Sequence, residues 1–281
     1  MNIITIGTLK GGTGKTTVAF NIAGYLAKKK NKVLIIDADP QANISTNLGL
    51  EPEFGEDEYD TFSDVLEKQL SAAFAIQKNI LDNNACKIDL IPASIDLTST
   101  DSFLCVTSMN KGVGHLQFRK WVEDNRMILE QYDYIICDVG PNISMVTQNC
   151  LLASNEIYLV SDISVNGFKG AKLFVEAWGD ICDNLMIENK VKGLIINRYD
   201  KRTALSEQFV SYIRSEHAFD NLIFDTLLPE NVQFKYADNE SLPICLYSPT
   251  CTGAKAIKTL ITEMQSKNLL LKINNNKEGE K

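Results

Sequence analysis

Two lysines in a glycine-rich segment near the N-terminus have the types and spacing to bind phosphate. The segment reads Lys10-Gly11-Gly12-Thr13-Gly14-Lys15-Thr16-Thr17. Glycines let the main chain curl so that successive N–H groups point at one anion, and a helix starting there adds unpaired amides and its positive dipole end. In such a loop Lys15 would neutralise the β- and γ-phosphates of a nucleotide, and the Thr16 hydroxyl would bind Mg²⁺.

The match to the phosphate-loop pattern G-x-x-x-x-G-K-[ST] is incomplete, because Leu9 occupies the first glycine position. The alternative is a glycine-rich turn with an incidental Lys-Thr pair. An apolar run at residues 3–7 precedes the segment, and helical spacing of apolar residues follows from residue 16 to residue 30. This strand-then-helix setting is the one that a phosphate loop requires, so we favour the phosphate loop.

Two apolar stretches end in carboxylates that could serve the same phosphates. Residues 33–36 lead into Asp37 and Asp39, which are two positions apart. Residues 134–137 lead into Asp138, a Walker B pattern whose carboxylate would hold Mg²⁺. A single carboxylate at a strand end is often only a helix cap, so each is informative mainly in combination with the phosphate loop.

A further strand-like run, residues 191–196, ends at Asn197. An amide side chain offers both donors and an acceptor, so Asn197 could match the edge of an adenine base. The same residue could equally cap a helix, and both interpretations stay open.

These polar residues fall at the carboxyl ends of expected strands, where parallel sheets have their ligand crevice. Apolar, β-branched runs predict strands at 3–7, 33–37, 88–91, 134–138, 156–161, 191–197 and 222–228, and helical spacing predicts helices at 16–30 and 115–130. This alternation indicates an α/β fold: one P-loop domain over residues 1–271, with a mostly parallel twisted sheet of about seven or eight strands and helices on both faces. An acidic stretch at 51–60 is interpreted as a solvated loop, and the polar segment 272–281 as a frayed tail.

The bulk composition is typical of a cytoplasmic globular protein. Of the 281 residues, 44% are hydrophobic and 23% are charged. No apolar run approaches the roughly 20 residues needed to cross a bilayer, and the first residues lack the features of a signal peptide. The seven cysteines include no C-x-x-C pair, so reduced structural thiols are expected. A net charge of −8 argues against a uniformly basic nucleic-acid-binding surface but allows a local basic patch.

Residues 10–17 resemble the deviant Walker A motif of the ParA/MinD ATPases, Lys-Gly-Gly-x-Gly-Lys-Thr-Thr, and residues 37–41 resemble that family's Asp-x-Asp-Pro-Gln motif. The resemblance implies an ATPase that binds ATP and Mg²⁺ and forms a homodimer in its ATP state. Lys10 would reach across the dimer to the partner's nucleotide, much as an arginine finger does. Asp39 would orient the attacking water, and Asp37 would support the phosphate and Mg²⁺ region.

Taken together, the motifs and the resemblance assign a role to each site residue. The expected catalytic residues are Lys10, Lys15 and Asp39. The expected Mg²⁺-binding residues are Thr16, Asp37 and Asp138. The expected nucleotide-binding residues are Lys10, Gly11, Gly12, Thr13, Gly14, Lys15, Thr16, Thr17, Asn197 and Pro229. Gly140 stands where the family's switch II segment has a proline.

Residues 199–206, Tyr-Asp-Lys-Arg-Thr-Ala-Leu-Ser, resemble the Tyr-Asp-x-Arg-Thr-x-Leu-Ser segment of plasmid and chromosome partition ATPases. This implies a DNA partition ATPase that binds DNA non-specifically, associates with the nucleoid in its ATP state, and is reset by hydrolysis that a centromere-binding ParB-like adaptor stimulates. The candidates for contacting DNA are Arg198, Lys201, Arg202, Arg214, Lys235, Lys255 and Lys258. Glu230 departs from the arginine that relatives often carry after this turn's proline.

Three other functions stay open. A MinD-like positioning ATPase would bind a membrane through a C-terminal amphipathic helix at residues 256–271, although the apolar stripe there equally suits packing on the sheet, and a membrane is the less expected partner. A ParA-like ATPase could instead position a protein cargo. A redox ATPase like the nitrogenase iron protein would need cysteines that hold an iron–sulfur cluster between subunits, for which Cys105 and Cys137 are the candidates.

Overall fold

Strand segments from the whole chain pair into one seven-stranded sheet. The structure, a computed structural model, describes residues 1–50, 59–83, 85–219 and 221–271. The strand order is β3-β4-β2-β5-β1-β6-β7, and all neighbours are parallel except β3, which pairs with β4 in the antiparallel sense. The strands are β1 (Asn2–Gly7), β2 (Val33–Ala38), β3 (Gln77–Asn83), β4 (Cys86–Ile91), β5 (Tyr134–Val139), β6 (Glu156–Asp162) and β7 (Val191–Asn197).

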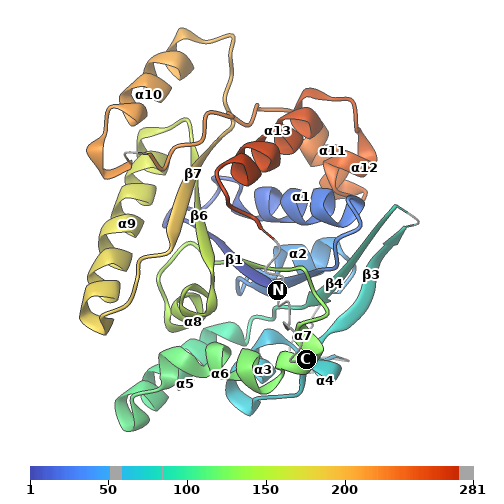
Figure 1. Ribbon diagram of the computed structural model, residues 1–281, viewed down its shortest axis with the longest axis vertical. Coiled ribbons are helices and arrows are strands. Elements are labelled where there is room, and N and C mark those ends of the chain that lie inside the picture. The colour runs from blue at the N-terminus through green and yellow to red at the C-terminus, as the bar shows by residue number, and fades with distance from the viewer. Residues whose placement is uncertain (51–58, 84, 220, 272–281) are drawn as a thin grey trace, which may run out of the picture.

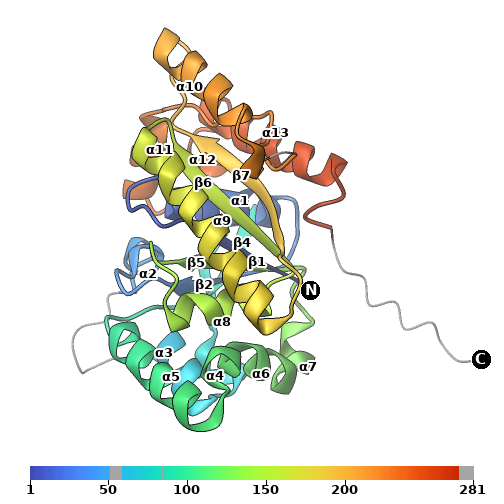
Figure 2. The same ribbon diagram turned by 90° about the vertical axis from the view of Figure 1, so that its left-hand side faces the viewer.

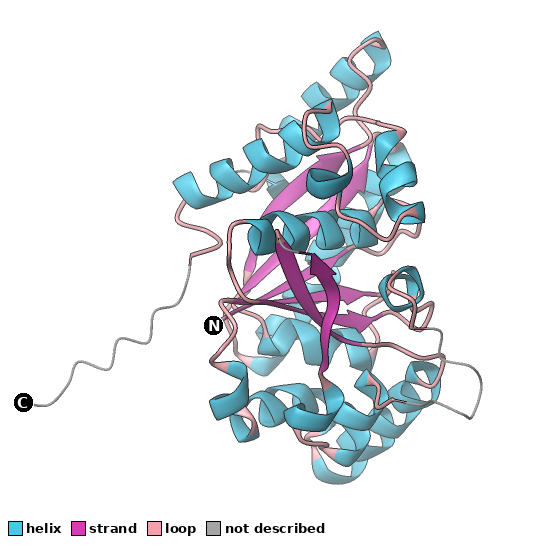
Figure 3. Ribbon diagram, turned by 90° about the vertical axis from the view of Figure 1, so that its right-hand side faces the viewer, coloured by secondary structure: helices cyan, strands magenta, loops and turns pink. Residues whose placement is uncertain are grey.

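Helices cover both faces of this sheet (Figure 1 and Figure 3), which confirms the expected α/β architecture. The helices on one face are α1 (Lys15–Lys28), α11 (Gln233–Asn239), α12 (Ile244–Tyr247) and α13 (Thr252–Ser266). Those on the other face are α3 (Phe62–Lys68), α4 (Ala72–Ala75), α5 (Leu97–Lys111), α6 (Gln117–Asp124), α7 (Arg126–Leu129), α8 (Met145–Ala153), α9 (Val165–Leu185) and α10 (Ala204–Arg214). Short elements are α2 (Asn43–Asn47), η1 (Gly114–Leu116) and η2 (His217–Phe219).

The alternation of side chains along each strand divides the core between the two faces. Ile35 and Ile136 pack in the cluster that contains the side chains of α1. Leu34 and Ile135, one residue earlier, point to the opposite face and pack with α3 and α6. A third cluster joins β6 and β7 to α9, which lies along these two strands (Figure 2). Because both faces are covered, the central strands read as nearly continuous apolar runs.

The expected strand at residues 222–228 does not form, whereas the six other expected strands are confirmed. Ile223 of this segment makes one isolated bridge, to Leu194 of β7, and Pro229 just beyond it makes a second, to Tyr199. Between the bridges, the N–H groups of Asp225 and Thr226 donate to the carboxylate of Glu263 at 2.8 and 2.9 Å. The carboxylate of Glu263 in α13 therefore replaces the main-chain partner only at Asp225 and Thr226, whereas Leu222, Phe224 and Leu228 still form main-chain hydrogen bonds with β7.

The edge strand β3 lies in a segment for which the sequence pattern predicts no strand. Its residues are mostly polar, and its pairing with β4 shifts register between Gln77 and Leu81. Asn79 has a φ of +53°, and its N–H donates to the carboxylate of Asp89 at 2.7 Å. An irregular strand at the edge of a sheet has only one neighbour to satisfy, so it forms without the apolar run that marks a central strand.

The helix expected at residues 115–130 is interrupted, because α6 ends at Asp124 and α7 begins at Arg126. Asn125 lies between them, and its Oδ1 accepts the N–H of Ala72 at 2.8 Å. The side chain of Asn125 thus satisfies the start of α4 from the point where the expected helix breaks. The helix expected at 16–30 is confirmed as α1, which begins at Lys15 and ends at Lys28.

The last helix, α13, directs its apolar stripe into the core. Its buried apolar side chains include Ile257, Leu260, Ile261 and Met264. After the helix, the N–H of Leu270 donates to Glu156 Oε2 at 3.0 Å and its carbonyl accepts the Tyr134 hydroxyl at 2.8 Å. The expected tail at 272–281 and most of the acidic stretch at 51–60 lie outside the described residues. Within the described ranges, none of the helices combines the length and apolar character that crossing a bilayer requires.

Candidate active site

The glycine-rich segment forms a loop between the end of β1 and the start of α1. Gly12 and Gly14 have φ values of +79° and +89°, a backbone region that residues with a Cβ rarely adopt. Gly14 is the N-cap of α1 and supplies no side-chain cap, so the first N–H groups of the helix are available to an anion. The loop therefore has the backbone geometry that phosphate binding requires.

Asn197, at the end of β7, supports this loop. Its Nδ2 donates to the Thr13 carbonyl oxygen at 2.8 Å, and a Cβ added to Gly14 would lie 2.3 Å from that nitrogen. A larger residue at position 14 would displace Asn197 as well as strain the backbone. In this structure the Asn197 amide donates to the protein's own loop, and its expected contact with adenine stays a prediction.

Lys15 is buried within the loop, where 6% of the residue is exposed. Its Nζ donates to the main-chain oxygen of Lys10 at 3.5 Å. Burial lowers the pKa of Lys15, and the negative charges of Asp138 and Asp39 oppose that shift. The ammonium group is thus held among carboxylates in a place where a phosphate would supply a closer partner.

Two of the expected metal-binding carboxylates lie opposite each other on neighbouring strands. Asp37 of β2 pairs in register with Asp138 of β5, and both side chains are buried. Ser45 fixes Asp37, because its N–H and hydroxyl donate to Asp37 Oδ2 at 2.9 and 2.8 Å. Burial raises the pKa of Asp37 to about 6, although the hydrogen bonds from Ser45 lower it in part.

Asp138 is the open acceptor of this pair. Among the described residues, neither of its buried carboxylate oxygens has a hydrogen-bond partner of normal geometry. Burial, together with the charge of Asp37, raises the pKa of Asp138 well above its ordinary range, although the nearby Thr16 hydroxyl favours the charged form. A buried carboxylate that lacks donors favours a cation or a proton. Asp138 and Thr16 therefore fit Mg²⁺, whose remaining ligands would be water and phosphate oxygens.

Asp39 lies just beyond the end of β2. Its Oδ1 accepts the N–H of Gln41 at 3.0 Å, and its carbonyl accepts the N–H of Ala42 at 2.8 Å, so a turn fixes its position. A Cβ added to Gly140 would lie 3.6 Å from the Asp39 carboxylate. Asp39 thus stands close to the segment that follows Asp138. Its role in orienting water stays a prediction.

The side chain of Lys10 leaves the phosphate loop toward the start of α9. Its Nζ donates to Asp162 Oδ2 at 3.0 Å and to Ser164 Oγ at 3.0 Å. About a third of this side chain, 31%, is exposed. The structure therefore brings Lys15 but not Lys10 among the carboxylates of its own site.

A hollow of about 810 Å³ is lined by Tyr199, two residues after Asn197, and by Pro229, the expected contact of the base. Three of the expected DNA-contacting residues, Lys201, Arg202 and Lys235, line the same hollow, so the two sets of predictions share one surface.

All seven basic residues expected at DNA are exposed. Two of them have acidic partners. Arg202 forms a bidentate pair with Asp200 at 2.9 and 2.8 Å and lowers the pKa of Asp200 to about 2. Arg214 lies 3.5 Å from Asp225.

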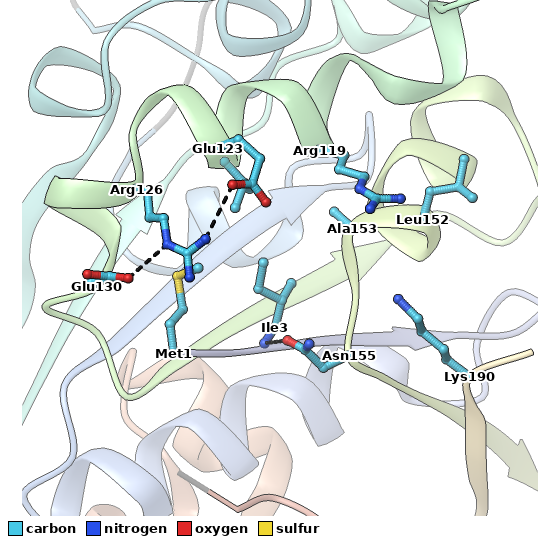
Figure 4. A pocket seen from close by; sticks show the side chains of 11 residues that line it. Met1, Ile3, Arg119, Glu123, Arg126, Glu130, Leu152, Ala153, Asn155 and Lys190 are labelled. Atoms are coloured by element: carbon cyan, nitrogen blue, oxygen red, sulfur yellow. Dashed lines mark hydrogen bonds and ion pairs between the residues drawn. The ribbon is translucent and has the colours of Figure 1, made fainter. Parts of the chain in front are cut away.

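A different cavity, of about 250 Å³, lies at the opposite end of the sheet, beside the first residues of β1 (Figure 4). Arg119, Arg126 and Lys190 line it, and Arg126 is neutralised by Glu123 and Glu130. None of the expected site residues lines this cavity, so it is not part of the candidate active site.

Ser45, Asp162 and Ser164 contact expected site residues, but the sequence analysis did not identify them. Asp162 is the last residue of β6, so the rule that picked out Asp138 at the end of β5 would also have found it. The expected strand at 156–161 stopped one residue short of this position. No sequence pattern points to Ser45, because its bond to Asp37 joins two residues that are eight positions apart, one in β2 and the other in the short helix α2.

A glycine-rich loop, a buried lysine and two facing carboxylates at the carboxyl ends of parallel strands define the chain as a P-loop ATPase. The AAA domain family model matches residues 1–192, and the chain belongs to this family. Among the curated proteins that it resembles over most of its length are partition ATPases named Soj and ParA, in agreement with the ParA/MinD resemblance of residues 10–17.

Two curated relatives and one solved structure illustrate this similarity. The chain is 29% identical over 255 residues to the chromosome-partitioning ATPase Soj of Treponema pallidum (strain Nichols), covering 91% of this chain and 93% of that protein. It is 29% identical over 268 residues to the chromosome partitioning protein ParA of Caulobacter vibrioides (strain NA1000 / CB15N), covering 95% of each. The McdA–ATP complex of Cyanothece shares the fold, with a TM-score of 0.79 at 22% identity over 96% of this chain and 97% of that one.

Proposed function

We propose that this chain is an ATP-dependent DNA partition ATPase. ATP and Mg²⁺ drive it into a dimer, the dimer binds DNA without sequence preference, and hydrolysis stimulated by a centromere-binding ParB-like adaptor returns monomers. The observation that carries this proposal is the separation of two lysines from one loop, because Lys15 is buried inside it whereas Lys10 extends out of it. A cation held outside its own site suits a role at the phosphates of another subunit.

In the proposed reaction, a water oxygen attacks the γ-phosphorus and the bond to the β,γ-bridging oxygen breaks, which leaves ADP and phosphate. Lys15 and the N–H groups of the loop would bind the triphosphate and stabilise the charge that develops on the leaving oxygen. Asp39 would orient the water. Lys10 from the second protomer would add a positive charge that is present only in the dimer, so hydrolysis would depend on dimerisation.

Mg²⁺, when bound, supplies positive charge to the β- and γ-phosphates. Thr16 and Asp138 would hold it, because Asp138 has free acceptor capacity. Oδ2 of Asp37 already accepts two hydrogen bonds from Ser45. Asp37 would therefore contribute to Mg²⁺ binding through a bound water and through its negative charge, without contacting the ion directly.

Dimerisation is tested in an Asp39→Ala background, in which slow hydrolysis should preserve the ATP state. Light scattering should show an ATP-dependent dimer for this variant and a monomer once Lys10→Ala is added, while both bind ATP. Lys172→Ala is the matched control, because it removes an exposed α9 lysine that pairs with Glu216 outside the loop, and it should dimerise normally. A normal ATP-dependent dimer without the Lys10 side chain would refute the cross-subunit role.

The exposed basic residues near the end of the chain support DNA as the ligand. Binding through phosphate neutralisation weakens linearly as the logarithm of salt concentration rises. Lys255 and Lys258 are exposed on α13 and have no carboxylate partner among the described residues. Replacing both by Ala should weaken ATP-dependent DNA co-sedimentation and reduce its salt slope by about 2. An unchanged slope would remove these two lysines from the interface.

The MinD-like alternative is disfavoured by α13, because its apolar stripe is buried in the core and is not available to a lipid surface. A redox ATPase is disfavoured because, of the two candidate cysteines, Cys105 is exposed but Cys137 is completely buried in β5, where it cannot bridge two subunits. Co-sedimentation with anionic liposomes, run beside the DNA assay, separates the first alternative from the proposal. An ATP-dependent dimer that binds neither DNA nor liposomes would favour a protein cargo.

A further inference from the structure

Lys10 is held by a carboxylate of its own chain, through bonds that we call the Lys10 contact: those among Lys10, Asp162 and Ser164. The Lys10 ammonium donates to both side chains at 3.0 Å, and the Ser164 hydroxyl donates to Asp162 Oδ1 at 2.6 Å. Asp162 ends β6, and Ser164 is the N-cap of α9. These positions are far from the phosphate loop in sequence, so the contact depends on the folded sheet.

We propose that Asp162 is a positioning residue that sets the strength of ATP-dependent dimerisation by competing for Lys10. The inference rests on the proposed function, in which Lys10 moves to the nucleotide of a second protomer. In the monomer, the Asp162 carboxylate neutralises the lysine and holds it on its own subunit. Dimerisation must break the Lys10 contact, so its strength opposes the dimer.

Helix α9 is shaped to approach this contact closely. A Cβ added to Gly167 would lie 1.9 Å from Asp162 Oδ1, and one added to Gly170 would lie 3.1 Å from the Lys10 Cβ. Both glycines lie on the same face of α9 because they are three residues apart. The Ser164 hydroxyl also accepts the N–H of Gly167 at 3.0 Å, which fixes the start of the helix against the carboxylate. The Lys10 contact is therefore part of the packing between α9 and the phosphate loop.

The two lysines of the phosphate loop lie beside different carboxylates, which supports a separate role for the Lys10–Asp162 pair. Lys15 is held by the fields of Asp138 and Asp39, whereas Lys10 pairs with Asp162. The Asp162 side chain is 13% exposed and the Lys10 side chain 31%, so solvent weakens the pair without replacing it. The two lysines of one loop are thus assigned to different carboxylates, and only the Lys10 pair is reachable from another molecule.

Removing the Asp162 carboxylate is expected to change the dimer dissociation constant strongly, because both protomers lose the Lys10 contact. A partly exposed ion pair is worth up to about fivefold in an equilibrium constant. Two Lys10 contacts open for each dimer that forms, so Asp162→Asn should tighten the ATP-dependent dimer by up to about 25-fold. The affinity of the monomer for ATP should not change, because Lys10 does not lie at its own phosphate site.

The test measures dimer dissociation constants by sedimentation in the Asp39→Ala background with ATP and Mg²⁺. Asp162→Asn should lower the constant, and Ser164→Ala, which keeps the carboxylate but removes one acceptor of Lys10, should lower it less. Glu216→Gln is the matched control, because it removes the ion pair that Lys172 of α9 makes away from the phosphate loop, and it should leave dimerisation unchanged. A dimer that forms but is unchanged or weakened by Asp162→Asn would overturn the inference, whereas no dimer in any variant would overturn the proposed function instead.

A second measurement needs no dimer and guards against a variant that folds poorly. Lys10 in the nucleotide-free protein is labelled with a small amine-reactive reagent, and the labelled peptide is quantified by mass spectrometry. Asp162→Asn should raise the labelling rate at Lys10 severalfold, and Glu216→Gln should raise it only at Lys172. Equal labelling of Lys10 in the wild type and in Asp162→Asn would show that the carboxylate does not hold this lysine.

Discussion

Replacing Asp37 by Asn should stabilise the nucleotide-free protein at neutral pH. The same change removes a negative charge that is expected to support Mg²⁺ binding. Asp37 is completely buried, and burial raises its pKa from 3.8 to about 6. This difference of about 2 units, at about 1.4 kcal/mol per unit, puts the destabilisation from ionised Asp37 at about 3 kcal/mol. An Asn side chain can keep both bonds from Ser45 at its amide oxygen and lose only the 3.4 Å bond from the Asp39 N–H.

The sign of the pH dependence follows from the raised pKa. Below about pH 4 the carboxyl is protonated in both the folded and the unfolded states, and Asp37 has no ionisation penalty. Between about pH 4 and pH 6 the folded state binds more protons, so the stability of the wild type falls as pH rises. The Asp37→Asn variant lacks this titration. Its advantage in unfolding free energy should therefore grow across that window and level off at about 3 kcal/mol above it.

Urea unfolding of the nucleotide-free proteins from about pH 4 to about pH 8 measures this difference. Asp124→Asn is the matched control, because it removes an exposed carboxylate of α6 and should leave the pH profile of the wild type unchanged. If Asp37→Asn and the wild type gave parallel profiles, the buried-charge argument would be wrong. If the argument is right, Mg²⁺ and ATP should stabilise the wild type more than the variant. A bound cation would offset the free-energy cost of burying the Asp37 charge, and the variant has no such charge.

Three further changes test other parts of the site. Lys15→Ala should abolish ATP binding in calorimetry, since it removes the only buried lysine of the described residues; retained binding would contradict its role. Asn197→Ala should weaken ATP binding about tenfold by freeing the Thr13 carbonyl, and an unchanged affinity would show that the loop needs no such support. Glu263→Ala should lower the unfolding free energy by about 1–2 kcal/mol, because the N–H groups of Asp225 and Thr226 lose their acceptor; urea unfolding would detect it.

The parts of the site that follow local rules could be predicted from the sequence. Glycines that need positive φ, a lysine at the start of a helix, and aspartates at the ends of apolar strands each show their role within a few residues. That is why the phosphate loop, Asp37 and Asp138 were found, and why their strands have nearly the expected bounds. The sheet then brings Asp37 and Asp138 into register, which no local pattern states but which parallel pairing requires.

The parts that were missed depend on partners distant in the chain. The segment at 222–228 has the composition of a strand, but its pairing with β7 is interrupted at Asp225 and Thr226, whose N–H groups donate to the carboxylate of Glu263, more than thirty residues later. The Lys10–Asp162 pair spans 152 positions, and its geometry depends on glycines in α9 that no apolar pattern marks. The strand expected at 222–228 is interrupted, and the Lys10 side chain is held on its own chain, in each case by a single carboxylate that the fold brings in.

The charges of the unliganded site explain why a nucleotide can act as a switch here. Asp138 has no donor of normal geometry among the described residues, Asp37 is raised to a pKa of about 6, and the pKa of Lys15 is lowered by burial. Mg²⁺ or a phosphate would supply each of these groups with a further counter-charge, so binding of ATP and Mg²⁺ should offset the cost of burying them. Lys10 is the exception, because Asp162 already neutralises it. In the proposed cycle, Lys10 stays paired with Asp162 when one protomer binds its ligands, and the phosphates of a second protomer would compete for it.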